Sequence, residues 1–109
     1  MAKNLRLTDT VVIANGGTVS ATLTLENGRI PLALILPAAL TGTTITFKAS
    51  SDNATFNPIY YESTSYSLTV STSRHVALNR IVFEGVKYFQ VVSGSAEGAA
   101  RTIGVISGE

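Results

Sequence analysis

Residues 18–25 alternate strictly between apolar and polar side chains. The apolar positions are Val19, Ala21, Leu23 and Leu25. A period of two is the pattern of a β-strand that turns one face to a core and the other to water. Asn27 and Gly28 follow, and both residue types tolerate the positive φ that a tight type I′ turn requires. The pattern therefore predicts a strand over residues 18–25 that leads into a hairpin turn.

The alternation recurs along most of the chain, between clusters of turn-forming residues such as Asn-Gly, Ser-Asp-Asn and Glu-Gly. Regularly spaced turn signals are typical of antiparallel sandwiches and barrels. A single helical turn is expected over residues 79–83, and a long loop over residues 93–100. We predict an all-β fold, an antiparallel β-sandwich of about eight strands that is jelly-roll-like. The expected strands are residues 10–14, 18–25, 30–36, 44–49, 59–62, 66–70, 75–78, 87–93 and 102–106.

One face of these strands supplies the predicted core. Its members are Val19, Ala21, Leu23, Leu25, Ile45, Phe47, Leu68, Val70, Val76, Leu78, Tyr88 and Ile103. Residues 30–36 differ because they are apolar on both faces, which indicates cover on both sides. Pro31 has no N–H for a ladder and belongs at a strand start or a sheet edge.

Two segments are predicted to mediate assembly. Residues 1–8 have the composition of an N-terminal arm, and residues 9–109 form a single sandwich domain. The arm carries two leucines that a compact sandwich does not need. The strand over residues 30–36 needs a neighbouring subunit or a loop as its second cover. The predicted assembly interface consists of Leu5, Leu7, Ile30, Leu32, Leu34 and Ile35.

Composition narrows the function classes. Charged residues make up only 14% of the chain and the formal net charge is +1. A surface covered by Ser and Thr loses little on desolvation and suits contact with protein, although these residues are also simply common on strands. No basic stripe is present, so no nucleic-acid partner is expected. The absence of cysteine, of a signal peptide and of a long apolar run predicts synthesis in the cytoplasm and no membrane partner.

No residue cluster suited to catalysis is visible. His75 has no metal-ligand partners at useful spacing, and it is expected to face either solvent or an interface from its strand. The carboxylates lie scattered, mostly beside turns where charge is ordinarily solvated. They are Asp9, Glu26, Asp52, Glu62, Glu84, Glu97 and Glu109. We therefore expect no enzymatic activity, no metal site and no cofactor.

An aromatic cluster between residues 56 and 66 supports a second hypothesis. Tyr60, Tyr61 and Tyr66 on one face of a sandwich could stack on a sugar. Asp52 and Asn53 could join such a site or bind calcium. The alternative is ordinary packing, with Phe56 in the core and the tyrosines at an edge, their hydroxyls in water.

Three segments resemble structural proteins of tailed bacteriophages and prophages. The first is residues 36–56, L-P-A-A-L-T-G-T-T-I-T-F-K-A-S-S-D-N-A-T-F; the others are residues 73–78, S-R-H-V-A-L, and 83–91, F-E-G-V-K-Y-F-Q-V. The resemblance spans about residues 30 to 106 and implies a sandwich scaffold without catalytic residues. It does not extend to residues 1–29.

This resemblance, with the low charge and missing catalytic cluster, implies a virion protein. The expected role is a capsid decoration, or cement, protein that bridges major capsid protein subunits on the outer head surface. A lattice-bridging part is expected to be a homo-oligomer, a dimer or a trimer. A neck, tail or head-fibre component is the alternative within virions. A carbohydrate-binding sandwich module for host attachment is the alternative from another class.

Overall fold

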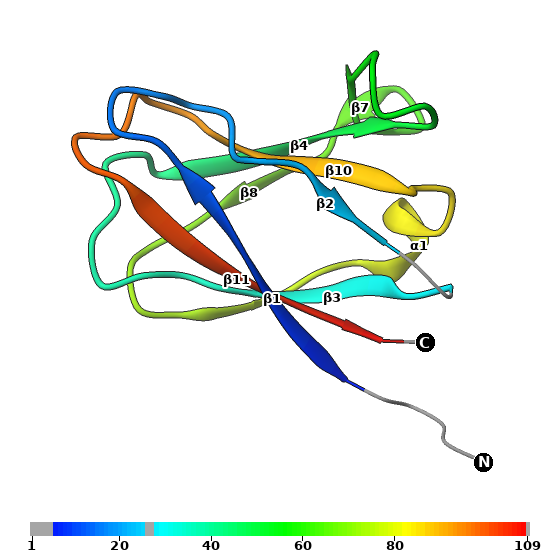
Figure 1. The fold of residues 1–109 in the computed structure, drawn as a ribbon, viewed down its shortest axis with the longest axis horizontal. Helices are drawn as coiled ribbons and strands as arrows, with labels where there is room; N and C mark the ends of the chain where they lie inside the picture. Colours follow the sequence, from blue (N-terminus) through cyan, green and yellow to red (C-terminus); the bar gives the residue numbers. More distant parts are fainter. Residues whose placement is uncertain (1–5, 26–27, 109) are drawn as a thin grey trace.

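The computed structural model describes residues 6–25 and 28–108, which form two antiparallel sheets packed face to face (Figure 1). The four-stranded sheet has the order β1 (Leu7–Ile13), β11 (Arg101–Gly108), β3 (Ile30–Ile35), β9 (His75–Ala77). The five-stranded sheet has the order β2 (Leu23–Thr24), β10 (Tyr88–Ser93), β4 (Thr44–Ser50), β5 (Asn57–Pro58), and β8 (Ser67–Thr69) also pairs with β4. A separate two-stranded sheet joins β6 (Tyr60–Tyr61) to β7 (Thr64–Ser65).

The strand pairing is that of a jelly roll. Leaving aside β5 and the β6–β7 pair, the first strand pairs with the last, as β1 with β11. The next pairs inward are β2 with β10, β3 with β9, and β4 with β8. A long antiparallel hairpin that folds over on itself gives this order, with two Greek keys. The predicted jelly-roll-like antiparallel sandwich is therefore confirmed.

The prediction for residues 18–25 is wrong in two respects. Only Leu23–Thr24 forms strand, while Ser20 and Val19 make single bridges to Ile13 and Val92. The segment crosses from the edge of one sheet to the other, so no single face of it can stay against the core. β2 and β3 then lie in different sheets and form no hairpin. Gly28 has the expected positive φ of 73°, whereas Glu26 and Asn27 lie outside the described residues.

The core lies between the sheets and is built around a cluster of aromatic rings. Phe47 packs edge-on against Phe83 at 5.1 Å between ring centroids and lies 6.2 Å from Phe89. The prediction is confirmed for the buried residues Leu25, Ile45, Phe47, Val70, Leu78 and Ile103. Leu23, Leu68 and Val76 are half-buried against this core.

Three predicted core residues are placed differently. Val19 and Ala21 are exposed, because Ser20 turns inward at the crossing and its hydroxyl accepts the Val91 N–H at 2.9 Å. Tyr88 is only half-buried, and Phe89 beside it is fully buried instead. Residues 86–92 are bulky on both faces, so their pattern does not determine which face the other sheet covers.

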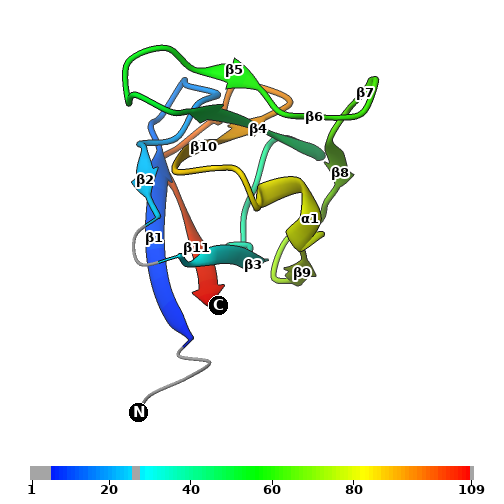
Figure 2. The same cartoon turned by 90° about the vertical axis from the view of Figure 1, so that its right-hand side faces the viewer.

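The start of the chain also differs from the prediction. β1 begins at Leu7, so Leu7 and Thr8 belong to a strand paired with β11 rather than to an arm. β1 runs along one edge of the sandwich (Figure 2).

The predicted helical turn is confirmed as α1 (Arg80–Phe83), which begins where the Asn79 side chain accepts the Ile81 N–H. In the described part of the chain, no helix is long and apolar enough to cross a membrane.

Candidate functional site

Among the described strand residues, the outward side of the four-stranded sheet carries no Asp, Glu, Lys or Arg. The strand registers place β1 residues opposite β11 residues, and so on across β3 to β9. Since Val11, Ile103, Leu34 and Val105 point into the core, their strand neighbours point outward. These neighbours and the residues paired with them across the sheet define the neutral face: Thr8, Thr10, Val12, Ala33, Ile35, His75, Ala77, Thr102, Gly104 and Ile106.

The neutral face is partly apolar at its centre. Ile35 lies opposite Gly104, and an added Cβ on that glycine would stand 3.1 Å from the Ile35 Cβ. The missing side chain lets Ile35 lie over the neighbouring strand. Val12 is 42% exposed at the edge of the face. Exposed threonines surround these apolar groups, so a partner could cover the face without stripping water from any fixed charge.

The predicted interface residues are divided by the structure. Ile35 lies on the neutral face, whereas Leu34 is fully buried in the core and is unavailable to a partner. Ile30 is half-buried against the core, and Leu32 is half-buried as well. Leu7 is 39% exposed in β1, and Leu5 lies outside the described residues. Strand alternation sends Leu34 inward and Ile35 outward, so β3 is indeed apolar on both sides.

Apart from Ile35, no residue of the neutral face was among the predicted interface residues, and its two other large apolar members show why. Val12 and Ile106 come from opposite ends of the chain, and only the pairing of β1 with β11 brings their strands together. Each lies in a short apolar run, V-V-I and I-G-V-I, that reads as core. The alternation within these runs was the available signal, because one of two adjacent apolar residues in a strand must face outward.

The three candidate tyrosines do not share a surface. Tyr60 and Tyr61 are 59% and 45% exposed on the β6–β7 pair. Tyr66 instead packs against the core, where its ring stacks on Phe47 at 5.9 Å, and its hydroxyl accepts the Asn79 N–H. The prediction that these three tyrosines lie together on one face and stack on a sugar is therefore wrong. Phe56, also in that cluster, is half-buried.

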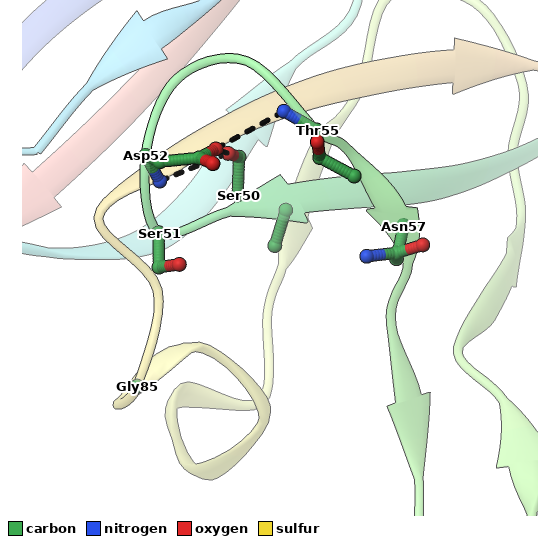
Figure 3. Close-up of a pocket in the computed structure, with 7 residues that line it drawn as sticks. Ser50, Ser51, Asp52, Thr55, Asn57 and Gly85 are labelled. Carbon is green, nitrogen blue, oxygen red and sulfur yellow. Dashed lines mark hydrogen bonds between the residues drawn. The ribbon is translucent and has the colours of Figure 1, made fainter.

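A polar pocket of about 370 Å³ opens beside the loop that follows β4 (Figure 3). It is lined by Ala49, Ser50, Ser51, Asp52, Thr55, Asn57 and Gly85, none of them aromatic. The Asp52 Oδ1 accepts the N–H groups of Thr55 and Ala54 and the Ser50 hydroxyl. These bonds, that from Thr55 foremost, lower the pKa of Asp52 to about 2. The carboxylate thus holds its own turn and is not poised to exchange protons near neutral pH.

Among the described carboxylates, Glu97 is buried, contrary to the expectation that the carboxylates are mostly solvated. Its side chain is fully buried, and it accepts hydrogen bonds from the Thr41 and Gly42 N–H groups at 2.8 and 3.0 Å. The Ser93 hydroxyl donates at 2.7 Å and the Arg101 Nε at 2.9 Å. Burial raises the pKa of Glu97, but these bonds outweigh it and lower the pKa to about 2. Glu97 therefore joins the β3–β4 and β10–β11 loops at one end of the sandwich.

Among the described residues, no group of three or more His, Cys, Asp and Glu side chains is placed to hold a metal ion. His75 is exposed on β9, opposite Ile35, as expected for the solvent side of a strand. In the pocket the Ser50 hydroxyl donates to Asp52 at 2.8 Å, and in the Glu97 cluster the Ser93 hydroxyl donates to Glu97 at 2.7 Å. Both carboxylates also accept backbone N–H groups, so they hold the local backbone in place.

The fold and the neutral face define a class, that of small cysteine-free jelly-roll domains with an uncharged sheet surface. Among solved structures, the chain is similar to the crystal structure of SPBc2 prophage-derived protein YomS. The TM-score is 0.56 with 11% sequence identity, and the match covers 98% of each chain. At this identity the similarity concerns the fold. No protein-family model matches the chain, and no curated protein is significantly similar to it in sequence.

Proposed function

We propose that this chain is a non-enzymatic virion protein of a bacteriophage or prophage, made in the host cytoplasm and assembled on the head. Its role is that of a decoration, or cement, protein that bridges major capsid protein subunits on the outer surface. Two lines support this. Its fold is shared over nearly the whole chain with a prophage-derived protein, and its sequence resembles phage structural proteins. The jelly roll by itself fits many functions, so the neutral face carries the argument.

The neutral face fits contact between copies of the chain. In a two-fold symmetric dimer each side chain near the axis meets its own copy. A fixed charge there would meet a like charge, whereas threonine, valine and isoleucine meet without repulsion. We therefore assign the neutral face to a homo-oligomer, with a dimer as its simplest form. Two joined copies present two identical outward sides, which is what bridging requires.

The tests are the oligomeric state of the purified protein and its presence on heads. We expect a dimer or trimer by light scattering, and copurification with DNA-filled heads in a fixed copy number per particle. A monomer that is absent from the heads contradicts the proposal. Recovery with tails instead of heads supports the neck or tail role, and binding to host polysaccharide alone supports a carbohydrate-binding module.

Thr10→Glu tests the neutral face directly. Thr10 is exposed on β1, so the variant should fold, yet it places a charge where two copies meet. An unpaired charge in an interface costs several kcal/mol, so we expect self-association to weaken by about 100-fold. Thr69→Glu is the matched control, since Thr69 is an exposed threonine at the end of β8 in the other sheet. Equal association of both variants in sedimentation equilibrium would show that the neutral face is not the contact between copies of the chain.

A further inference from the structure

A two-stranded ribbon, residues 60–65, stands out from the sandwich on the side of the five-stranded sheet (Figure 1, upper right). In it Tyr60 pairs with Ser65 and Tyr61 with Thr64. Glu62 and Ser63 form the turn, and Glu62 has a positive φ of 59°. The neutral face belongs to the other sheet. The ribbon and the neutral face are therefore separate surfaces on opposite sides of the molecule.

The base of the ribbon is fixed to the core. Ile59 is buried and donates its N–H to the Phe47 carbonyl at 2.9 Å. Tyr66 donates its N–H to the Ile59 carbonyl at 3.0 Å, which closes the ribbon, and its ring stacks on Phe47. A two-stranded hairpin alone is marginally stable in water. These anchors fix the base of the ribbon, which reduces the conformational entropy that the ribbon loses when it binds.

The two tyrosines project to opposite sides of the ribbon. Successive residues of a strand face opposite ways, so Tyr60 shares one side with Ser65 and Tyr61 shares the other with Thr64. Tyrosine with serine is the composition of protein-binding loops, since the rigid ring gives contact area and the hydroxyls give adaptable hydrogen bonds. A flat partner or a single sugar ring would meet only one tyrosine. Both are used when the ribbon enters a groove with two walls.

We infer that the ribbon inserts into a groove between two protein walls, with Tyr60 against one wall and Tyr61 against the other. The floor of the groove carries a lysine or arginine that faces Glu62, the single charged residue of the ribbon. This inference rests on the proposed function, in which the groove is the junction of two neighbouring major capsid protein subunits. The copies joined at their neutral faces then direct their ribbons away from one another, into separate junctions.

The first experiment measures binding to DNA-filled heads stripped of the protein. Tyr60→Ser and Tyr61→Ser should each weaken binding by about tenfold, because buried tyrosines are typical interface hot spots. Both variants should keep the self-association and thermal stability of the unmodified protein. Ile81→Ser is the matched control, since Ile81 on α1 is 58% exposed and lies outside the ribbon. Unchanged binding by either tyrosine variant overturns the inference.

A second experiment asks whether the ribbon has two walls around it. The photoreactive residue p-benzoylphenylalanine is placed at position 60 or 61, and crosslinks to heads are mapped by mass spectrometry. We expect crosslinks to two different segments of the capsid protein. Crosslinks to one shared segment, or to polysaccharide, overturn the inference. Glu62→Lys should abolish binding, while Glu62→Gln should weaken it by only a few-fold; equal effects of the two exclude the basic floor.

The two proposals fail in different ways. If the unmodified protein does not bind heads, the proposed function fails before any ribbon variant is tested. If it binds heads and the tyrosine variants bind equally well, the ribbon inference fails while the proposed function stands. If Thr10→Glu loses self-association but still crosslinks through position 60, the neutral face and the ribbon act separately, as the inference requires.

Discussion

Replacing Glu97 with alanine is expected to destabilise the sandwich by about 3–5 kcal/mol, because it leaves buried donors without their acceptor. The carboxylate takes the Thr41 and Gly42 N–H groups and pairs with Arg101 at 2.9 Å. Thr41 and Gly42 lie in the β3–β4 loop and Arg101 begins β11, so the end of the sandwich that Glu97 joins should loosen as well. Urea unfolding at neutral pH measures the loss. A change below about 1 kcal/mol would show that water replaces the carboxylate without cost.

The same residue predicts a loss of stability in acid. The pKa of Glu97 is about 2 in the folded protein, against an ordinary value of 4.5. The unfolded chain therefore binds a proton first, and stability present above pH 4.5 is lost as the pH falls towards 2, by roughly 3 kcal/mol. Glu97→Gln should remove this part of the dependence of the unfolding free energy on pH. Asp52→Asn is the companion variant, since the pKa of Asp52 is also about 2; it should leave the Glu97 part intact.

Phe47→Ala is expected to cost about 3–5 kcal/mol, the loss typical of a buried phenylalanine truncated in a packed core. Phe47 is 1% exposed, and its ring contacts Phe83, Phe89 and Tyr66. Its carbonyl also receives the Ile59 N–H at the base of the ribbon. Binding to heads should therefore weaken together with the free energy of unfolding. Differential scanning calorimetry and urea unfolding give the first quantity, and head sedimentation gives the second.

Leu23→Ala is the comparison for the core. Leu23 is only half-buried against the cluster and lies in the short strand β2, so truncation removes fewer contacts. We expect less than half the loss seen for Phe47→Ala. Equal losses would mean that β2 is packed more tightly than its exposure indicates, and would return residues 18–25 to a central place in the core.

Several local features follow from the sequence alone. Residues 30–36, 44–49 and 87–93 form strands close to their predicted bounds, because short runs rich in apolar, β-branched and aromatic residues between turn signals favour strand locally. The turn of helix after Asn79 is equally local, since the capping side chain bonds an N–H two residues ahead. Pro31, expected at a strand start, is the second residue of β3.

The tertiary structure decided which side of each strand is covered. Alternation sorts residues into two faces, but which one meets the opposite sheet depends on partners far away in sequence. Phe89 rather than Tyr88 is therefore buried, and Ser20 turns inward at the crossing between the sheets. Glu97 lies in a segment of small residues that reads as loop, and only the approach of residues 41–42 makes it a buried anchor.

The surfaces proposed for function depend on both the sequence pattern and the tertiary structure. The apolar positions of β3 are visible in the sequence, but the neutral face exists because β1 and β11, from opposite ends of the chain, lie beside it. The tyrosines are likewise visible as a cluster. Packing of Tyr66 against Phe47 and Phe83 separates it from Tyr60 and Tyr61, because a ring that joins the core leaves the surface. The sequence thus determined the strands and their two faces, and long-range pairing determined which faces remain open to a partner.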